Sequence, residues 1–312
     1  MNPIDRAGPD AARPGAERFG AARARLAALA FARDSLLCRE ARGFSTARQD
    51  LFLATYMAMR LIDDHVDHLV DVDRGWQSPA LGAIDGWQRR VQAAVDGRIE
   101  PGAEGYEEAV LVLLAGTVPP SPLDGRAFDA LARAMRRDAL GQPLRSWQDF
   151  LDYAEGATVA PTFVFLTLLA LDGEARRLPA RLRLERLWQR ARPMAVYCYL
   201  VHIVRDLAKD AAAGPHLLTI PGELFADLCA DRQALARAIL QGDQPVTGPL
   251  ARRLLERLHT LEPEVAAACL AIQPQLSPES RASLGRIIEH YGDRARQIAV
   301  HSSMAGPAAG IR

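Results

Sequence analysis

The sequence predicts an all-α protein in which long helices form a single-domain bundle. Apolar residues recur at three- and four-residue spacing nearly throughout the chain, whereas alternating β-branched residues are scarce. The breaks between the apolar stretches are short, and none has the composition of an interdomain linker. With 312 residues, 49% of them hydrophobic, the chain can bury one sizeable core. A single helical bundle is the simplest architecture that fits these observations.

The helices follow one another with Gly or Pro residues at most of the breaks. Helical periodicity places them at 17–41, 46–70, 80–97, 104–116, 124–140, 147–172, 180–212, 231–241, 247–272 and 277–301. The main breaks, in order, are 97–102, 119–122, 141–143, 173, 214–215 and 274. Residues 1–16 are rich in Pro, Gly and Ala and predict a flexible N-terminal arm. The helical domain is expected to span 17–302, and 303–312 to form a flexible tail.

The composition excludes several classes of function. The 38 basic and 38 acidic residues balance, and no long basic run is present, so we expect no nucleic-acid partner. The four cysteines are scattered without a CxxC pair, which argues against a thiolate metal site and suits a cytoplasmic protein. No uninterrupted apolar run reaches the ~18–20 residues of a membrane span, and the N-terminus does not resemble a signal peptide. Peripheral contact with a membrane remains compatible with this composition. Lys209 is the only lysine, so nearly all of the positive charge is arginine.

Two acidic runs carry most of the chemical information. Asp63 and Asp67 end one long apolar stretch, and Asp206 and Asp210 end another. Each pair is spaced four residues apart, which places both carboxylates on one face of a helix. For either run alone, a solvent-facing salt-bridge ladder or a charged helix end is the alternative. Two such faces opposite each other would instead bind Mg²⁺, a cation that prefers oxygen ligands.

Other polar residues share these helical faces. Tyr56 and Arg60 precede the first pair on the same stripe, and His202 lies one turn before the second pair. Asp64 is turned by about a hundred degrees and is expected beside the metal ligands. Arg205 directly precedes Asp206. Such stripes are too polar for an ordinary buried helix face.

Paired carboxylates on two helices indicate a diphosphate substrate. Mg²⁺ held by carboxylates keeps several waters and binds substrate phosphates. With arginine it would neutralise a leaving diphosphate, and the allylic carbon left behind would become a carbocation. Such a cation needs a dry cavity lined by apolar and aromatic groups. Aromatic candidates on the relevant helices are Tyr56, Tyr153, Phe163, Phe165 and Tyr197, although ordinary core packing is the alternative for each.

Four segments resemble the squalene/phytoene synthase family, the head-to-head isoprenyl diphosphate synthases. The first, at 42–67, ends in Y-M-A-M-R-L-I-D-D-H-V-D. The others are Y-A-E-G-A-T-V-A-P at 153–161, I-V-R-D with a further aspartate at 203–210, and L-L-T-I-P at 217–221. Their order and separation match the family pattern, and the resemblance extends from about residue 30 to residue 225.

The resemblance implies an all-α isoprenoid synthase fold around a central apolar cavity. By that resemblance, Mg²⁺ is held by a metal group formed from Asp63, Asp64, Asp67, Asp206 and Asp210. Diphosphate is gripped by Arg60 and Arg205, with Ser35 close to the early serine of the family. Tyr56 and Tyr153 match tyrosines near the reacting carbons, and His202 is a further catalytic candidate on the path of the proton.

The chain departs from the family pattern at several cavity positions. His202 replaces an asparagine, Tyr199 replaces a glutamine, and 214–215 is Gly-Pro instead of Gly-Arg. Lys209 stands where an acidic residue is common. In the segment 158–162, Pro161 is expected to break or kink its helix because it lacks a backbone N–H.

The expected function is a Mg²⁺-dependent prenyltransferase that condenses two allylic isoprenyl diphosphates, such as farnesyl or geranylgeranyl diphosphate. The altered cavity leaves a single-substrate terpene synthase or cyclase as an alternative, and a catalytically inactive assembly protein as another. A phosphohydrolase using His65 and His68 is a weaker reading. NADPH is needed only for reductive squalene formation, and the sequence has no Gly-rich nucleotide fingerprint.

Overall fold

The computed structural model describes residues 15–33, 35–72, 77–215 and 218–304, and all regular structure within them is helical. The all-α fold class predicted from the sequence is confirmed. The α-helices are α1 (Ala16–Ala32), α2 (Leu36–Ala41), α3 (Thr46–Val72), α4 (Gln77–Val95), α5 (Gly105–Thr117), α6 (Arg126–Ala139), α7 (Trp147–Ala154), α8 (Ala160–Ala170), α9 (Leu184–Ala213), α10 (Arg232–Gln241), α11 (Gln244–Ile272) and α12 (Pro278–Met304). Shorter helices are η1 (Glu155–Val159), η3 (Gly222–Leu224) and η4 (Gln273–Gln275).

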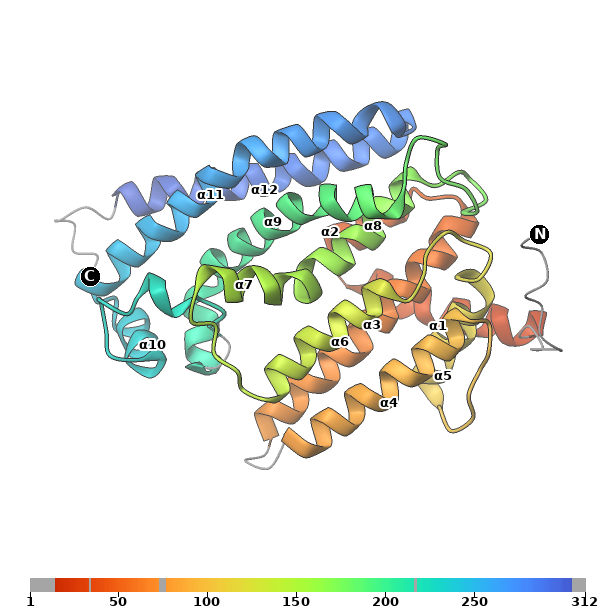
Figure 1. Cartoon of the computed structure of the whole chain (residues 1–312), viewed down its shortest axis with the longest axis horizontal. Helices are drawn as coiled ribbons and strands as arrows, with labels where there is room; N and C mark the ends of the chain where they lie inside the picture. Colours follow the sequence, from red (N-terminus) through yellow and green to blue (C-terminus); the bar gives the residue numbers. More distant parts are fainter. Residues whose placement is uncertain (1–14, 34, 73–76, 216–217, 305–312) are drawn as a thin grey trace, which may run out of the picture.

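The helices form two groups that meet at α7, η1 and α8. In one group, α3 packs against α1, α4, α5 and α6. In the other, α9 packs against α10, α11 and α12. The continuous segment α7–η1–α8 contacts both, since η1 touches α6 and α9, and α8 touches α3 and α9 (Figure 1). The two acidic runs therefore lie on the central helices of different groups.

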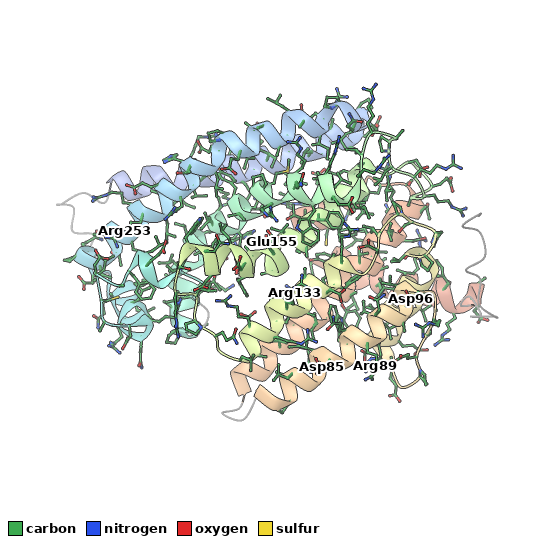
Figure 2. The ribbon with its side chains drawn as sticks, viewed as in Figure 1. Asp85, Arg89, Asp96, Arg133, Glu155 and Arg253 are labelled. Atoms are coloured by element: carbon green, nitrogen blue, oxygen red, sulfur yellow. The ribbon has the colours of Figure 1, made fainter. Side chains whose placement is uncertain are left out.

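One hydrophobic core runs through both groups, from Ala22 to Ala295. Charged side chains such as Asp85 and Arg89 lie on the outward face of α4, and Asp96 is exposed in the turn that follows it (Figure 2). Most of the predicted arm and tail, residues 1–14 and 305–312, lies outside the described residues.

The first predicted helix, 17–41, is two helices in the structure. Helix α1 ends at Ala32, and α2 begins at Leu36 after extended backbone at Arg33 and Ser35. Apolar periodicity continues through this turn, so the pattern alone does not reveal it. The interruption turns Ser35 and α2 back toward α3, where Ser35 hydrogen-bonds with Tyr56.

Pro161 does not break its helix. The helical run from Trp147 to Ala170 is continuous, and it contains a π-helical turn at Glu155–Val159 immediately before α8. In a π-turn the backbone hydrogen bonds change from i→i−4 to i→i−5. Pro161, which has no N–H to donate, follows directly after this turn, where the regular α-helical hydrogen bonding is already interrupted.

Both helix groups hold the π-turn in place. Glu155, labelled in Figure 2, accepts a hydrogen bond from Trp188 Nε1 at 2.7 Å. It also forms an ion pair with Arg192, and both partners lie on α9. On the opposite side, a Cβ at Gly156 would lie 2.1 Å from the carbonyl oxygen of Ala130 on α6. The absence of a side chain at Gly156 thus allows η1 to lie directly against the backbone of α6.

By length and composition, the run Trp147–Ala170 could also cross a membrane, with a mean hydropathy of 1.3 in its most apolar window. The fold buries 72% of this most apolar part of the run. A buried core helix can have the same length and composition as a helix that crosses a membrane.

Candidate active site

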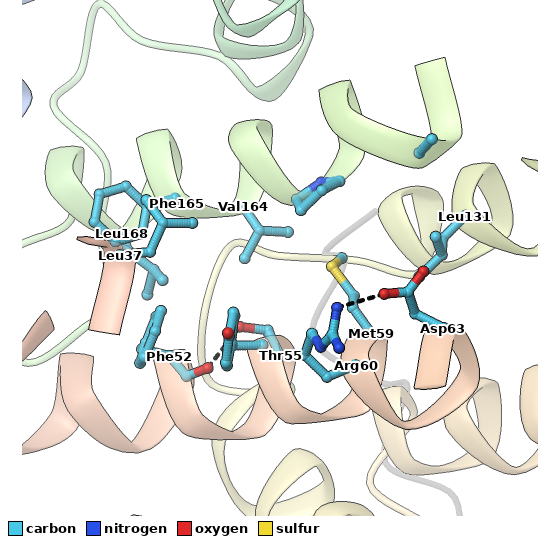
Figure 3. Close-up of a pocket in the computed structure, with 13 residues that line it drawn as sticks. Leu37, Phe52, Thr55, Met59, Arg60, Asp63, Leu131, Val164, Phe165 and Leu168 are labelled. Atoms are coloured by element: carbon cyan, nitrogen blue, oxygen red, sulfur yellow. Dashed lines mark hydrogen bonds and ion pairs between the residues drawn. The ribbon is translucent and has the colours of Figure 1, made fainter. Parts of the chain in front are cut away.

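Two adjoining cavities are both walled by α3, α6 and η1, and α9 completes the wall of one and α8 that of the other. The larger, of about 550 Å³, is polar and is lined by Arg60, Asp63, Asp138, Tyr153, Ala157, Thr158, Tyr199, His202, Ile203, Asp206, Asp210 and Thr219. The smaller, of about 150 Å³, is apolar and is lined by Leu37, Phe52, Thr55, Tyr56, Met59, Arg60, Asp63, Leu131, Ala157, Pro161, Val164, Phe165 and Leu168. Figure 3 shows side chains of α3 and α8 facing each other across the apolar cavity. Arg60, Asp63 and Ala157 belong to both walls, so the polar cavity and the apolar cavity adjoin at these residues.

Carboxylates from both acidic runs line the polar cavity. Asp63 reaches it from α3, and Asp206 and Asp210, one turn apart, reach it from α9. Asp67 follows Asp63 by one turn of α3, but its side chain lies outside the described part. Asp64 is not in the wall, since it pairs with Arg60 and with Arg33 at 2.9 Å. Among the described residues, no three His, Cys, Asp or Glu side chains are already drawn together as a metal cluster.

The electrostatics of the three cavity carboxylates fit a divalent cation. Burial raises the pKa of Asp63, although the guanidinium of Arg60, 2.5 Å away, opposes this shift. Burial and the neighbouring charge of Asp206 raise the pKa of Asp210. Buried carboxylates that repel one another are stabilised by a cation placed between them, and carboxylate oxygens are the ligands that Mg²⁺ prefers.

The two motif arginines lie on different sides of this wall. Arg60 lines both cavities. Arg205 instead faces a third cavity of about 510 Å³ between α9, α11 and α12, and its Nε donates to Asp206 at 2.9 Å. This hydrogen bond holds the pKa of Asp206 below its usual value. Lys209 is exposed on α9 between the two aspartates.

Two tyrosines and an aspartate form a hydrogen-bonded group in the polar wall. The hydroxyl of Tyr153 donates to Asp138 Oδ2 at 3.0 Å, and the hydroxyl of Tyr199 donates to Thr219 Oγ1 at 3.4 Å. The two tyrosine rings are 6.4 Å apart. Burial raises the pKa of Tyr153 well above 10.0 and that of Tyr199 to about 12, so both hydroxyls are neutral.

His202 is a neutral imidazole at the same wall. Its Nε2 lies 2.7 Å from the hydroxyl of Tyr291, which α12 brings to the site. Burial, and then the charge of Arg205, lower the pKa of His202 to about 4.

The aromatic candidates divide between the cavities and the core. Tyr56 and Phe165 line the apolar cavity, and Tyr56 stacks on Phe52 with ring centroids 5.1 Å apart. Phe163 is fully buried against Trp188, and Tyr197 is buried within α9, so both are ordinary core residues. Ser35 lines neither cavity and reaches the site only through its hydrogen bond with Tyr56.

Two side chains of the wall, and one that hydrogen-bonds to the wall residue His202, were not found from the sequence. Asp138, Thr219 and Tyr291 come from three different segments, and none belongs to a spaced acidic pair. Thr219 lies within the resembling segment 217–221, which was the one available signal. His65, considered as a phosphohydrolase ligand, is exposed and lines neither cavity, and His68 lies outside the residues with described side chains.

Comparison with known proteins gives a family and a fold for this chain. The squalene/phytoene synthase family model matches residues 41–301. A crystal structure of a dehydrosqualene synthase in complex with ligand superposes with a TM-score of 0.64 at 14% identity, covering 92% of this chain and 97% of that one. A complex of TcSQS with the ligand BPH1237 has a TM-score of 0.45 at 14% identity, covering 95% and 94% of the two chains. A search of curated proteins finds no match. The family resemblance read from the four segments is thus confirmed, and the chain belongs to the squalene/phytoene synthase family.

Proposed function

We propose that this protein is a Mg²⁺-dependent prenyltransferase that joins two allylic isoprenyl diphosphates and releases diphosphate. The observation that carries the proposal is the junction at Arg60, Asp63 and Ala157. There, a cavity lined by carboxylates of both acidic runs adjoins an apolar cavity. Such a space suits a molecule with an anionic head and a hydrocarbon tail. Family membership supports prenyl transfer as the reaction class.

The polar cavity would bind the diphosphate head. Asp63, Asp206 and Asp210 would hold Mg²⁺, which, when bound, neutralises the charge that develops on the leaving diphosphate. The guanidinium of Arg60 adds a fixed positive charge at the junction with the apolar cavity. Arg205 supports Asp206 through their hydrogen bond and would reach the head only from the edge of the site.

The apolar cavity would hold the reacting hydrocarbon. Loss of diphosphate leaves an allylic cation, which the faces of Tyr56 and Phe165 can stabilise while the apolar walls exclude water. The double bond of a second substrate then attacks the cation, and a proton is lost from the joined product. We also propose a cytoplasmic enzyme with peripheral membrane contact, because an apolar product of this kind partitions into a bilayer.

A second candidate is a terpene synthase or cyclase that uses one substrate. A cavity of about 150 Å³ holds a molecule the size of benzene. The apolar cavity has this volume, so in the described conformation it accommodates only part of one farnesyl chain. Condensation of two chains requires a larger expansion of this cavity than cyclisation of one. An inactive assembly protein is the third candidate, favoured only by the changes at His202 and at 214–215.

The test is incubation of the purified protein with farnesyl and geranylgeranyl diphosphates, with Mg²⁺, and with or without NADPH. Released diphosphate is measured, and the organic extract is analysed by mass spectrometry. We expect diphosphate release that stops when Mg²⁺ is chelated, and a product with twice the carbon count of the substrate. A product with the substrate's own carbon count identifies the cyclase. Absence of diphosphate release from every C10–C20 allylic diphosphate would contradict both enzymatic proposals.

A further inference from the structure

The third cavity lies on the opposite face of α9 from the polar cavity. It is walled by α9, α10, α11 and α12, and its residues on α9 alternate with those that line the polar cavity. Figure 1 shows α11 and α12 separating toward the start of α11 and the end of α12, which is where the lining residues of both helices lie. No residue of this wall lines the polar or the apolar cavity. The third cavity is therefore separate from the candidate active site.

Most of the wall of the third cavity is apolar. Its apolar side chains are those of Val204, Leu207, Ala208, Ile239, Leu250, Ala251, Leu254 and Ile298. Two arginines, Arg205 of α9 and Arg294 of α12, are the charged side chains of the wall, and the described lining contains no Asp or Glu. Such a wall suits a ligand with an apolar body and one anionic group.

The two arginines differ in how far their charge is already neutralised. Arg205 donates to the carboxylate of Asp206 from Nε at 2.9 Å and from Nη2 at 2.5 Å, whereas its Nη1 bonds to no described residue. Arg294 is exposed and forms neither a hydrogen bond nor an ion pair within the described part of the chain. About one uncompensated positive charge thus remains at the cavity, which matches a head group with a single negative charge.

The volume of the third cavity limits the size of this ligand. A cavity of about 150 Å³ holds benzene, so 510 Å³ has room for roughly 20 non-hydrogen atoms. One acyl chain of about 12 to 14 carbons with its carboxylate fits this space. A phospholipid with two long acyl chains does not fit.

We propose that the third cavity binds the carboxylate form of a long-chain fatty acid. The carboxylate would bind Arg294 and the Nη1 of Arg205, because guanidinium N–H groups form strong charge-assisted hydrogen bonds with carboxylates. The acyl chain would pack against the apolar side chains of α9 and α11. Arg205 connects this site with the second acidic run, because the same guanidinium holds Asp206.

The experiment is isothermal titration calorimetry of the whole chain with laurate, below the concentration at which laurate forms micelles. Neither Mg²⁺ nor an isoprenyl diphosphate is added, so the result does not depend on the proposed function. We expect saturable binding of laurate. Hexanoate, which has the head group but a short chain, should bind at least about 10-fold more weakly, and so should dodecyltrimethylammonium, which has the chain but the opposite charge. Equal binding of the cation would contradict the role assigned to the arginines.

Two variants test the position of the ligand. Arg294→Gln should weaken laurate binding roughly 10-fold, because a charge-assisted interaction is lost. Arg296→Gln alters an exposed arginine of the same helix that pairs with Asp293 outside the cavity, so this control should bind laurate like the wild type. Ala251→Phe places a ring in the cavity and should abolish binding. If Ala251→Phe fails to fold, Arg294→Gln and its control carry the test.

The apolar cavity is the competing site for laurate, because it too combines apolar walls with an arginine, Arg60. Arg60→Gln should leave laurate binding unchanged. Loss of binding in Arg60→Gln, with wild-type affinity in Arg294→Gln, would overturn the inference and assign laurate to the candidate active site. Absence of saturable laurate binding to the wild type would also overturn it. Intact laurate binding by a protein that releases no diphosphate would contradict only the proposed function.

Discussion

At the scale of single residues, His202 in the wall of the polar cavity should make the stability of the protein depend on pH. Its pKa is about 4 in the folded protein against an ordinary value of 6.5, because burial disfavours the charged imidazole. Below pH 6.5 the unfolded chain binds a proton that the folded protein excludes. The free energy of unfolding should therefore fall as the pH drops from 6.5 to 4, and this contribution should be constant outside that window.

We predict that His202→Asn removes this part of the acid sensitivity. The pKa shift of His202 corresponds to an upper limit of about 3 kcal/mol in the free energy of unfolding. The measured loss should be smaller, because the ring is partly exposed to solvent. Urea unfolding at several pH values between 4 and 7 measures it, since the wild type should lose more stability across this range than the variant. His259→Asn, at an exposed position on α11, is the matched control and should follow the wild type. Parallel curves for His202→Asn and the wild type would contradict the prediction.

The spacing of the acidic runs predicted part of the cavity wall but not all of it. Asp206 and Asp210 reach the cavity together because a four-residue separation on α9 fixes their common face. The same geometry turns Arg205 by about a hundred degrees, toward the third cavity. Asp138 and Tyr291 could not be found in this way, since each meets its partner only through the packing of separate helices.

At the scale of elements, the π-turn is the structural unit on which the site depends. It supplies Ala157 to both cavities and Thr158 to the polar one. The sequence shows that Pro161 lacks an N–H, but not that α6 and α9 hold the backbone on both sides of the turn. Of the break or kink expected at Pro161, the break does not occur, because these tertiary contacts keep the helical run continuous.

We predict that Gly156→Ala destabilises the protein by about 1–3 kcal/mol or more, because the new Cβ meets the backbone of Ala130 and not a flexible side chain. A lower midpoint of urea unfolding measures this effect. Gly285→Ala, within α12, is the control, since no heavy atom lies within 4 Å of its Cβ position. The control should be neutral or more stable by up to about 1 kcal/mol, as expected for Ala in a helix. Equal stability of Gly156→Ala and the wild type would show that α6 and η1 can move apart freely.

At the scale of the whole molecule, the candidate site joins the two helix groups. Asp63 belongs to the group around α3, and Asp206 and Asp210 belong to the group around α9. A ligand bound by all three would connect the groups and should stabilise the entire fold by mass action.

We predict that farnesyl thiodiphosphate, which resists ionisation, raises the melting temperature only when Mg²⁺ is also present. At 100 times the dissociation constant, the gain of about 2.7 kcal/mol corresponds to a shift of roughly 5 °C. Differential scanning calorimetry with each component alone and with both provides the measurement. Replacement of Asp206 and Asp210 by Asn should abolish the shift, whereas Asp227→Asn, at a surface ion pair with Arg253, should not. A full shift without Mg²⁺ would rule out the carboxylate site.

The overall architecture was the most predictable level, because helical periodicity is a local property that repeats along the chain. The helices at 46–70, 231–241 and 277–301 agree with α3, α10 and α12 to within a few residues. The turn between α1 and α2 was missed because its residues continue the apolar pattern. Cavity volume is a sum over side chains from five or more helices, and no local pattern encodes it.

The position of Lys209 has a practical consequence. It is the chain's single lysine, and it is exposed on α9 between Asp206 and Asp210. A reagent that acylates amines can therefore modify only this side chain and the chain's own α-amino group. The extent of acylation at Lys209, read by peptide mass mapping, becomes a built-in reporter of whether ligand covers the second acidic run.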